Sequence, residues 1–510
     1  MRSFLMVAGG LALSGAALMA GCGASRNDPG MTHPELPPPV DSISGTVTFQ
    51  GAPLAGATIT LWMTNENTVK ATAITDASGH YSFTGISARG NVAGDYHIWA
   101  TKAGYGFYPT VGSGAKVIRA DHTGQFEPGA LLGVPMYLTV IHFVATENNS
   151  VANANFAAYD GTNPVVALSA TGQSQIYAAY DDGAMKSGVA LPAQRFVDHH
   201  DGTVTDNVTG LVWLRDAGCL QPGNWAAAGN EVNTLATGAC GLTDGSTAGQ
   251  WRMPNLVELE SVIDVSASSP ALPAGHPFAN VSNGLYWTST SYFGGEAGSP
   301  NAWTIHMADG RYVNDGVLNL KASASNAVWA VKGAGKGQAR LQATGLFNTF
   351  QAGDDGALQM GVGLMYPRFI DHADGTITDA LTGLIWVKMA NCIQGDWVTA
   401  LDAVHKLASG QCGLTDGSTA GQWRIPNRNE MQSLADRNQN NEADYLGFTF
   451  RNPDQSVFQA AVFPGFVGYQ YYWTSTTDAA DPSRAWTVFS CDFGVYDADK
   501  SQTGYALAVR

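Results

Sequence analysis

The chain has 510 residues and a formal net charge of −16, which argues against nucleic acid, anionic lipid headgroups or strongly anionic glycans as partners. Only 13% of its residues are charged, 45% are hydrophobic, and 60 are glycine. This length and composition predict two to four domains that are rich in β-strands and ordered loops.

The N-terminus is typical of an export signal, because Arg2 is followed by a short apolar run and then by small residues. Met19-Ala20-Gly21-Cys22 resembles a bacterial lipobox, in which the cysteine becomes the acylated first residue. We therefore expect residues 1–21 to be removed and lipidated Cys22 to anchor the protein to the outer membrane, exposed at the cell surface. The alternative is a plain secretory signal with a chance cysteine. Residues 22–41 are polar and proline-rich, which predicts a tether.

Residues 42–146 predict a β-sandwich, because about seven short alternating segments are separated by Gly, Pro and Asp turns. The segments GTV (45–47), GAPLAG (51–56) and TDASGHYSF (75–83) resemble the carboxypeptidase regulatory-like family. That resemblance implies a transthyretin-like or immunoglobulin-like sandwich that serves as a spacer or stabilising module. Residues 147–170 are expected to form a linker.

The remainder of the chain is a tandem repeat. RFVDHHDGTVTDNVTGLVW (195–213) recurs as RFIDHADGTITDALTGLIW (368–386), and CGLTDGSTAGQWRMPN (240–255) recurs as CGLTDGSTAGQWRIPN (412–427). We therefore expect two copies of one domain, at 171–335 and 344–510, and an insertion near 437–470 in the second copy.

Each copy predicts two helices among many short strands, which makes the copies α+β. The first helix begins at Trp225 or Trp397 and is expected to end at Gly238 or Gly410. The second helix has a glutamate three residues after its cap, which indicates a capping box. The expected N-caps are Asn224, Asn255, Asp396 and Asn427, and the capping-box glutamates are Glu258 and Glu430. Arg252 and Arg424 are candidates for structural ion pairs with these glutamates.

One pair of cysteines flanks the first helix of each copy, and exported cysteines usually pair. We expect disulfides between Cys219 and Cys240 and between Cys392 and Cys412. Closing a loop of about 20 residues in this way contributes about 3 kcal/mol. A zinc site is disfavoured because the spacing is not Cys-x-x-Cys. Cys491 is then expected to be a buried free thiol.

Repeated acids in the opening hairpin of each copy have two interpretations. Asp-Gly and the following acid are typical turn residues, and this interpretation is favoured. The same acids would also suit calcium, which prefers carboxylate oxygens brought together by a turn. The six candidates for a calcium site are Asp198, Asp201, Asp206, Asp371, Asp374 and Asp379.

Aromatic residues divide into two groups. Tryptophans that recur at matched positions among strand residues are expected to be core: Trp213, Trp251, Trp287, Trp303, Trp386, Trp423, Trp473 and Trp486. Aromatic residues of loops are better candidates for ligand binding. These candidates are Tyr292, Phe293, Tyr469 and Tyr471.

The repeated motifs resemble the Lcl C-terminal domain, which is named for a collagen-like bacterial adhesin. The matching motifs are DGT-x-TD-x-x-TGL-x-W, WR-x-PN-x-x-E, YWTST and a late Ala-Trp. The resemblance implies a C-type-lectin-like α+β layout, surface adhesion and binding of sulfated glycans. The acidity of this chain argues against a sulfated ligand.

We therefore expect paired binding domains for a glycan or extracellular matrix, with avidity if both engage one target. No cofactor is expected unless calcium binds. A purely structural envelope protein is the alternative. An enzyme is the third possibility, and it is disfavoured because the sequence has no serine elbow, phosphate loop or His-Glu-x-x-His motif.

Overall fold

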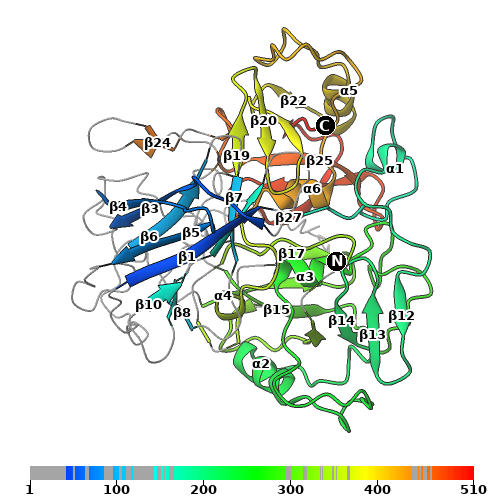
Figure 1. Ribbon diagram of the computed structural model, residues 1–510. Helices are drawn as coiled ribbons and strands as arrows, with labels where there is room; N and C mark the ends of the chain where they lie inside the picture. Colours follow the sequence, from blue (N-terminus) through cyan, green and yellow to red (C-terminus); the bar gives the residue numbers. More distant parts are fainter. Residues whose placement is uncertain are drawn as a thin grey trace, which may run out of the picture.

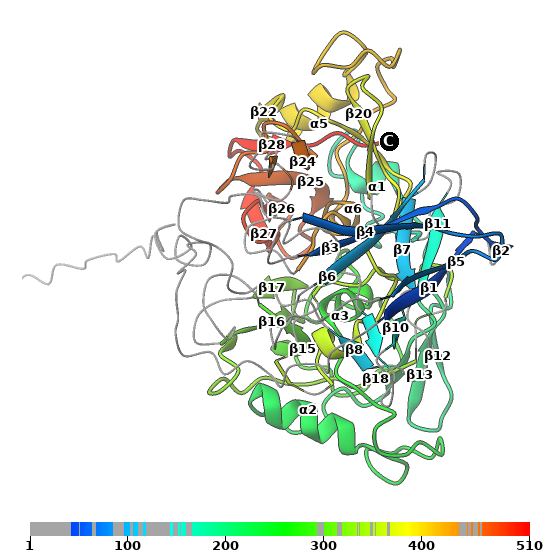
Figure 2. The same cartoon turned by 60° about the vertical axis from the view of Figure 1, so that its left-hand side comes forward.

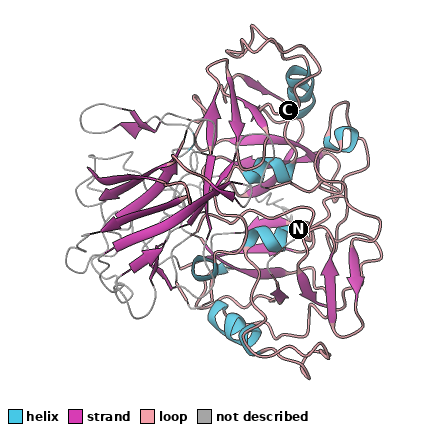
Figure 3. Cartoon of the chain, viewed as in Figure 1, coloured by secondary structure: helices cyan, strands magenta, loops and turns pink. Residues whose placement is uncertain are grey.

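The computed structural model shows a mostly β molecule with few helices (Figures 1 and 3). The N-terminal strands lie to one side of the two copies, and copy 2 is stacked on copy 1 in both views (Figure 2). The structure describes residues 42–49, 52–63, 68–84, 96–102, 106–110, 116–118, 143–145, 151–153, 155–159, 166–292, 300–313, 319–333, 335, 337–346, 350–351, 353–364, 368–437, 446, 450–451, 457–459 and 462–510. The export signal, Cys22 and the tether lie outside these residues.

The N-terminal part consists of two sheets. The smaller sheet has the order β4 (Thr68–Ile74), β3 (Thr58–Met63) and β6 (Tyr96–Thr101). The larger sheet, of eight strands, contains β1 (Ser42–Phe49), β2 (Ala52–Pro53), β5 (His80–Thr84), β7 (Gly106–Thr110), β8 (Lys116–Ile118), β9 (Phe143–Ala145), β10 (Val151–Asn153) and β11 (Asn155–Tyr159). Buried side chains come from both sheets, namely Val47, Tyr81 and Phe83 from the larger and Ile59, Leu61 and Ala100 from the smaller. The expected sandwich is therefore present.

Two strands lie where the sequence predicts a linker. β10 and β11 both pair in parallel with β1, through Ser42 and Val151 and through Val47 and Phe156. A little further on, Val166 is buried and its amide donates to the carbonyl of Leu381 in copy 2. The prediction of a linker over 147–170 is therefore wrong for these residues, whose short apolar runs supply sheet partners.

Each copy opens with a three-stranded meander that contains the expected hairpin. In copy 1 it is β12 (Phe196–Asp198), β13 (Thr203–Asp206) and β14 (Val212–Leu214), extended by β18 (Val331–Lys332). In copy 2 it is β19 (Phe369–Asp371), β20 (Thr376–Asp379) and β21 (Ile385–Val387). The registers match, because Val204 pairs with Trp213 as Ile377 pairs with Trp386.

A second sheet in each copy contains the Tyr-Trp-Thr-Ser-Thr strand. Copy 1 has β15 (Leu285–Ser291), β16 (Ala302–His306) and β17 (Arg311–Val313). Copy 2 has β22 (Ile393–Gly395), β28 (Gly504–Ala506), β25 (Tyr471–Thr477), β26 (Arg484–Phe489) and β27 (Val495–Asp499). A separate pair, β23 (Phe450–Arg451) and β24 (Val457–Gln459), lies in the insertion of copy 2.

The four expected helices begin at the expected residues. α2 (Trp225–Thr234) and α5 (Trp397–His405) are capped by Asn224 and Asp396, but both end before Gly238 and Gly410. α3 (Leu256–Ser261) and α6 (Arg428–Ser433) begin with complete capping boxes. Over the described residues, none of the helices has the length and apolar character needed to cross a bilayer.

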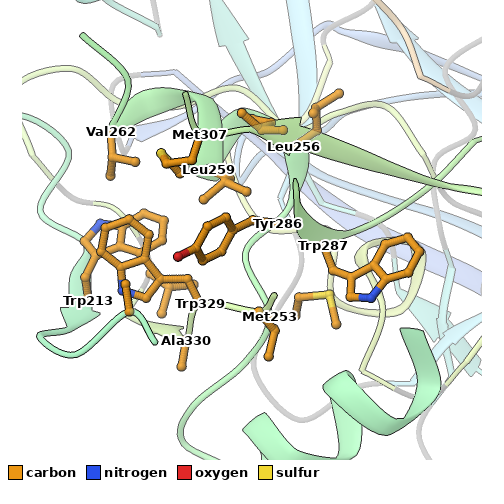
Figure 4. Packing of buried hydrophobic residues seen from close by; sticks show 14 of the residues in the cluster. Trp213, Met253, Leu256, Leu259, Val262, Tyr286, Trp287, Met307, Trp329 and Ala330 are labelled. Carbon is orange, nitrogen blue, oxygen red and sulfur yellow. The ribbon is translucent and has the colours of Figure 1, made fainter. Parts of the chain in front are cut away.

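The repeated tryptophans are all buried, as predicted. Around Trp213, Tyr286 and Trp329 the indole and phenol rings pack against aliphatic residues of α3 (Figure 4). Trp486 and Val495 of copy 2 belong to the same apolar cluster. The cores of the two copies are therefore continuous.

Candidate functional site

The aspartates of the two Asp-Gly sequences, Asp201 and Asp374, are turn residues. Asp201 accepts hydrogen bonds from the Thr203 amide at 2.9 Å and from its hydroxyl at 2.6 Å. Asp374 accepts the same two bonds from Thr376, at the same distances. Such side-chain contacts two residues along the chain are typical of Asx turns.

The last acid of each hairpin is fully buried in a bidentate ion pair. Asp206 accepts from Arg195 at 3.2 and 3.0 Å, and Asp379 accepts from Arg368 at 2.9 and 2.8 Å. Asp206 also accepts from the Thr209 hydroxyl and the Val208 amide. Its carboxylate oxygens are thus occupied by protein donors.

The calcium interpretation of the hairpin acids is not supported. Asp198 pairs with Arg215 at 2.8 Å, and Asp371 pairs with Lys388. Within the described ranges, no group of three His, Cys, Asp or Glu side chains is arranged to hold a metal ion. The repeated acids build turns and ion pairs instead.

Both expected ion pairs are present. Arg252 binds Glu258 in a bidentate pair at 2.6 and 2.5 Å, and Arg424 binds Glu430 at 2.6 Å through both nitrogens. Each glutamate also closes a capping box, so these carboxylates are held in place by two structural roles.

Both predicted disulfides are present, with Cα atoms 5.7 Å apart for Cys219–Cys240 and 5.6 Å apart for Cys392–Cys412. Each one ties the end of the loop after α2 or α5 back to the residues before that helix. Cys491 is fully buried and takes part in a disulfide. The prediction of a free thiol at Cys491 is therefore wrong.

The four loop aromatics have different surroundings. Tyr292 is 6% exposed and packs edge-to-face on Trp303 at 5.3 Å, so it belongs to the core and is not a ligand candidate. Phe293 lies outside the described residues. Tyr469 is 42% exposed, and Tyr471 is half-buried.

Tyr469 and Tyr471 form part of an aromatic group that we call the tyrosine cluster: Tyr469, Tyr471, Phe489 and Tyr496. Tyr471 lies 5.2 Å from Phe489 and 6.2 Å from Tyr496 between ring centroids, and Tyr469 lies 6.5 Å from Phe489. Burial, together with nearby Asp492, raises the pKa of Tyr471. The matched residues in copy 1 are Asn283, Leu285, His306 and Val313. The cluster thus distinguishes copy 2 from copy 1.

A feature that sequence analysis missed is the role of the segment before each copy. We call residues 171–189 arm 1 and residues 344–362 arm 2. Each arm contains a one-turn helix, α1 (Asp182–Met185) or α4 (Asp355–Leu358), capped by the preceding aspartate. The sequence identifies the arms as repeats of each other but does not reveal what they contact.

Each arm packs against the other copy. The Thr476 hydroxyl of β25 donates to Asp182 in arm 1 at 2.8 Å, and the Thr477 amide donates to Gln173 at 2.8 Å. In the reverse direction, the Thr290 hydroxyl of β15 donates to Asp355 in arm 2 at 2.7 Å. Figure 1 shows α1 beside α5 of copy 2 and α4 beside β15 of copy 1. The two copies therefore exchange equivalent arms within one chain.

Each arm contact also contains one lysine that lies near two aromatic rings. Lys500 of copy 2 lies 4.0 Å from the Trp397 ring centroid and 5.1 Å from that of Tyr177 in arm 1. Lys321 of copy 1 lies 4.4 Å from Trp225 and 4.3 Å from Phe350 in arm 2. Burial lowers the pKa of Lys321 to about 7 and that of Lys500 to about 8. Both lysines thus join an aromatic residue of the arm to one of the receiving copy.

The arm carboxyls are buried at the same contacts. Burial raises the pKa of Asp182 to about 6 and that of Asp355 to about 7, although two threonine hydroxyls donate to each carboxyl. The second threonine in each case belongs to the arm itself, Thr171 for Asp182 and Thr344 for Asp355, at 2.6 and 2.7 Å. Both acids therefore favour the neutral form more than an exposed aspartate does.

The centre of the interface differs between the copies. Arg428 of α6 lies 4.7 Å from the Trp486 ring centroid and 3.7 Å from the Glu260 carboxylate of α3, and it donates to the Gly310 carbonyl. The residue of copy 1 that matches Arg428 is Leu256. Two copies of either sequence alone would not reproduce this contact.

Two family models match the chain. One, described as the Lcl C-terminal domain, matches residues 202–332 and 375–510. The other, described as a carboxypeptidase regulatory-like domain, matches residues 42–130. A comparison with curated proteins finds no match. Both resemblances indicated by the sequence motifs are thereby confirmed, and both arms lie outside the matched residues.

Proposed function

Because the chain belongs to the family of the Lcl C-terminal domain, we propose that it is an adhesin-type surface protein that binds a glycan or an extracellular matrix component. The exchanged arms join its two copies into one body. On this proposal, the exported protein is displayed at the outer surface of the cell, and the N-terminal sandwich spaces the copies from the envelope. A C-type-lectin-like layout of the copies belongs to the same proposal.

The tyrosine cluster is the observation that carries the proposal. Tyrosine rings present flat apolar faces together with a hydroxyl group, which suits them to stack on sugar rings. Tyr469 is exposed and has a φ of 57°, a left-handed conformation that costs a non-glycine residue about 1 kcal/mol. An exposed aromatic residue held in a strained turn is more readily explained by a surface contact than by folding.

The net charge of the chain limits the classes of ligand that the proposed site would bind. The net charge of −16 repels sulfated or phosphorylated polymers over distances of about 10 Å at moderate ionic strength. The cations around the hairpin acids, such as Arg195, Arg368 and Lys388, are already paired with carboxylates. We therefore propose a neutral glycan, and neither nucleic acid nor a sulfated polymer.

A purely structural envelope protein is the second candidate function. The reciprocal arms and the continuous core favour it, because they make a compact building block without any ligand. An enzymatic role has less support, since Glu258 and Glu430, the acids next to the arm contacts, are both engaged in ion pairs.

The test is a glycan and matrix array probed with the mature full chain. Tyr469→Asn and Tyr471→Leu introduce the residues that copy 1 has at the matched positions. We expect each to weaken binding at least about tenfold, which corresponds to about 1.4 kcal/mol. We also expect Leu285→Ala, in copy 1, to leave binding unchanged, and a calcium chelator to have no effect.

Two outcomes decide between the candidate functions. Absence of binding by the wild-type chain to every glycan and matrix protein, with and without calcium, supports the structural role. Binding that is retained by both tyrosine variants removes the cluster from the proposal.

A further inference from the structure

A cavity of about 580 Å³ lies between the base of arm 1 and the body of copy 1, away from the tyrosine cluster. Its walls come from three segments, 170–174, 190–196 and 273–277, and from Asp182, Lys186 and Asp264. A volume of this size falls in the range that holds small ligands in proteins.

The floor of the cavity provides hydrogen-bond acceptors. Asp182 uses one carboxyl oxygen to accept from Thr171 and Thr476, and Asp264 uses one oxygen to accept from Ser266 at 2.9 and 2.6 Å. Over the described residues, the second oxygen of each carboxyl has no hydrogen-bond donor from the protein. These two oxygens remain available to accept hydroxyl hydrogens.

The lining also includes four polar side chains that form no side-chain hydrogen bond or ion pair within the described part of the chain: Ser174, Lys186, Gln194 and His276. The Nδ1 atom of His276 is buried and forms no hydrogen bond. Burial lowers the pKa of His276, which favours its neutral form. Because buried polar atoms in folded proteins normally have partners, this nitrogen points to an occupant of the cavity.

Other residues of the lining are apolar. Pro192, Phe196, Pro273 and Pro277 line the cavity. Arg195, which also lines it, is neutralised by Asp206. Lys186 is thus the one unpaired cation among the described lining residues, which also include Asp182 and Asp264. The site has little net charge to attract a charged ligand.

From this combination we propose that the cavity binds a neutral sugar of one to three rings. Its hydroxyl groups donate to Asp182 and Asp264, and an apolar ring face lies against Phe196 and the prolines. His276 and Gln194 bind the outer hydroxyls. The inference rests on the proposed glycan function for the class of ligand, but it assigns a separate site.

The second copy contributes to this site through the arm. Asp182 is held by Thr476, so the floor of a cavity in copy 1 depends on a contact with copy 2. Sugar binding in the cavity therefore requires the exchanged arm to be in place.

The experiment is calorimetric titration of the mature full chain with glucose, galactose, mannose and N-acetylglucosamine and their disaccharides. Ala193→Trp places an indole in the cavity from an exposed position on its lining. Ala248→Trp is the control, at an exposed loop position outside the lining. Tyr471→Leu, in a third variant, separates this site from the tyrosine cluster.

We expect at least one sugar to bind to the wild type, to Ala248→Trp and to Tyr471→Leu. Ala193→Trp should weaken that binding at least about tenfold, and His276→Ala should weaken it several-fold. Unchanged binding by Ala193→Trp overturns the proposal. So does failure of every sugar to bind while the array still detects glycan binding, a result that leaves the proposed function intact. Absence of binding in both experiments overturns both.

Discussion

Two buried aspartates dominate the electrostatics of the arm contacts. Asp182 and Asp355 occupy equivalent places in the two arms, and each accepts hydrogen bonds from two threonine hydroxyls. Burial is the main cause that favours the neutral carboxyl at both positions. The negative charge of Glu430 near Asp182, and of Glu258 near Asp355, acts in the same direction. The protonation of two single residues is therefore coupled to the attachment of the arms.

This coupling sets the sign of a pH effect. The pKa values of about 6 and 7 in the folded protein lie above the value of 3.8 for an exposed aspartate, so the folded state binds more protons between these limits. The contribution of the two protonated carboxyls to the free energy of unfolding is fully present below pH 3.8 and is lost as the pH rises through about 6 and about 7. The arms should thus be held most firmly in mildly acidic solution.

We expect Asp182→Asn and Asp355→Asn to remove this dependence, because an amide stays neutral and its oxygen still accepts from both threonines. The difference in unfolding free energy between each variant and the wild type should favour the variant more at about pH 7.5 than at about pH 4.5, by on the order of a few kcal/mol. Denaturant unfolding at the two pH values measures the difference. A change in stability that is equal at both pH values would contradict the assignment.

At the residue scale, contacts between side chains a few positions apart can be predicted from the sequence. The Asp201–Thr203 and Asp374–Thr376 contacts span two residues, so turn chemistry predicts them. The pairs Arg195–Asp206 and Arg368–Asp379 span eleven residues and require the strands to be in register, so the sequence alone does not decide between turns and calcium for these acids. Tyr292 was misassigned because a loop position does not reveal that its ring packs on Trp303.

At the scale of elements, the helix caps have two functions. Asn255 accepts from the Glu258 amide to cap α3, and its own amide donates to the Met360 carbonyl of arm 2 at 3.2 Å. Asn427 does the same for α6 and donates to Ser187 of arm 1 at 3.2 Å. Each capping asparagine therefore starts a helix and holds the arm of the other copy.

Two substitutions separate these functions. Asn427→Ser keeps an oxygen that can cap α6 but removes the donor to arm 1, whereas Asn427→Ala removes both. We expect the serine variant to lose up to about 1 kcal/mol and the alanine variant about 1 kcal/mol more. Hydrogen exchange at α1 should increase in both variants, while exchange at the start of α6 should increase only with alanine. Equal protection of α1 in wild type and variants would contradict the second function.

The starts of the helices can be predicted from sequence, whereas their ends and the parallel strand pairing cannot. N-caps and capping boxes fixed the starts of four helices, because these signals are contained within four residues. The glycines predicted too late an end for α2 and α5, since the last turns give way to loops that lead to the disulfides. β10 and β11 were missed because parallel pairing with a strand a hundred residues earlier leaves no local signal.

At the scale of the whole molecule, the two copies form one body with two unequal halves. The repeat predicted two domains, and sequence alone offered no reason to place arm 1 on copy 2. Arg428 and Arg437 replace Leu256 and Val265 of copy 1, and Arg437 lies 4.6 Å from the Trp303 ring centroid across the interface. The interface is thus built from residues that differ between the copies, which prevents each copy from replacing the other.

The exchange of arms between the two copies can be tested directly with an introduced disulfide. Tyr180 of arm 1 stacks on His405 of α5, with ring centroids 3.6 Å apart. Tyr180→Cys with His405→Cys places two thiols at this contact. This pair and its control are made in a Cys491→Ala background, because Cys219–Cys240 and Cys392–Cys412 pair within their own copies and the disulfide of Cys491 would otherwise hold the cleaved fragments together. Asn233 holds the position in copy 1 that matches His405, so Tyr180→Cys with Asn233→Cys is the matched control. A protease site is inserted between the copies, near residue 340.

After oxidation and cleavage of the full chain, a non-reducing gel separates the two possibilities. We expect the fragments to remain joined with Tyr180→Cys and His405→Cys and to separate with the control pair. Joined fragments require a bond from arm 1 to copy 2. Separation with the first pair, together with a bond between arm 1 and copy 1 in the control, would contradict the exchange.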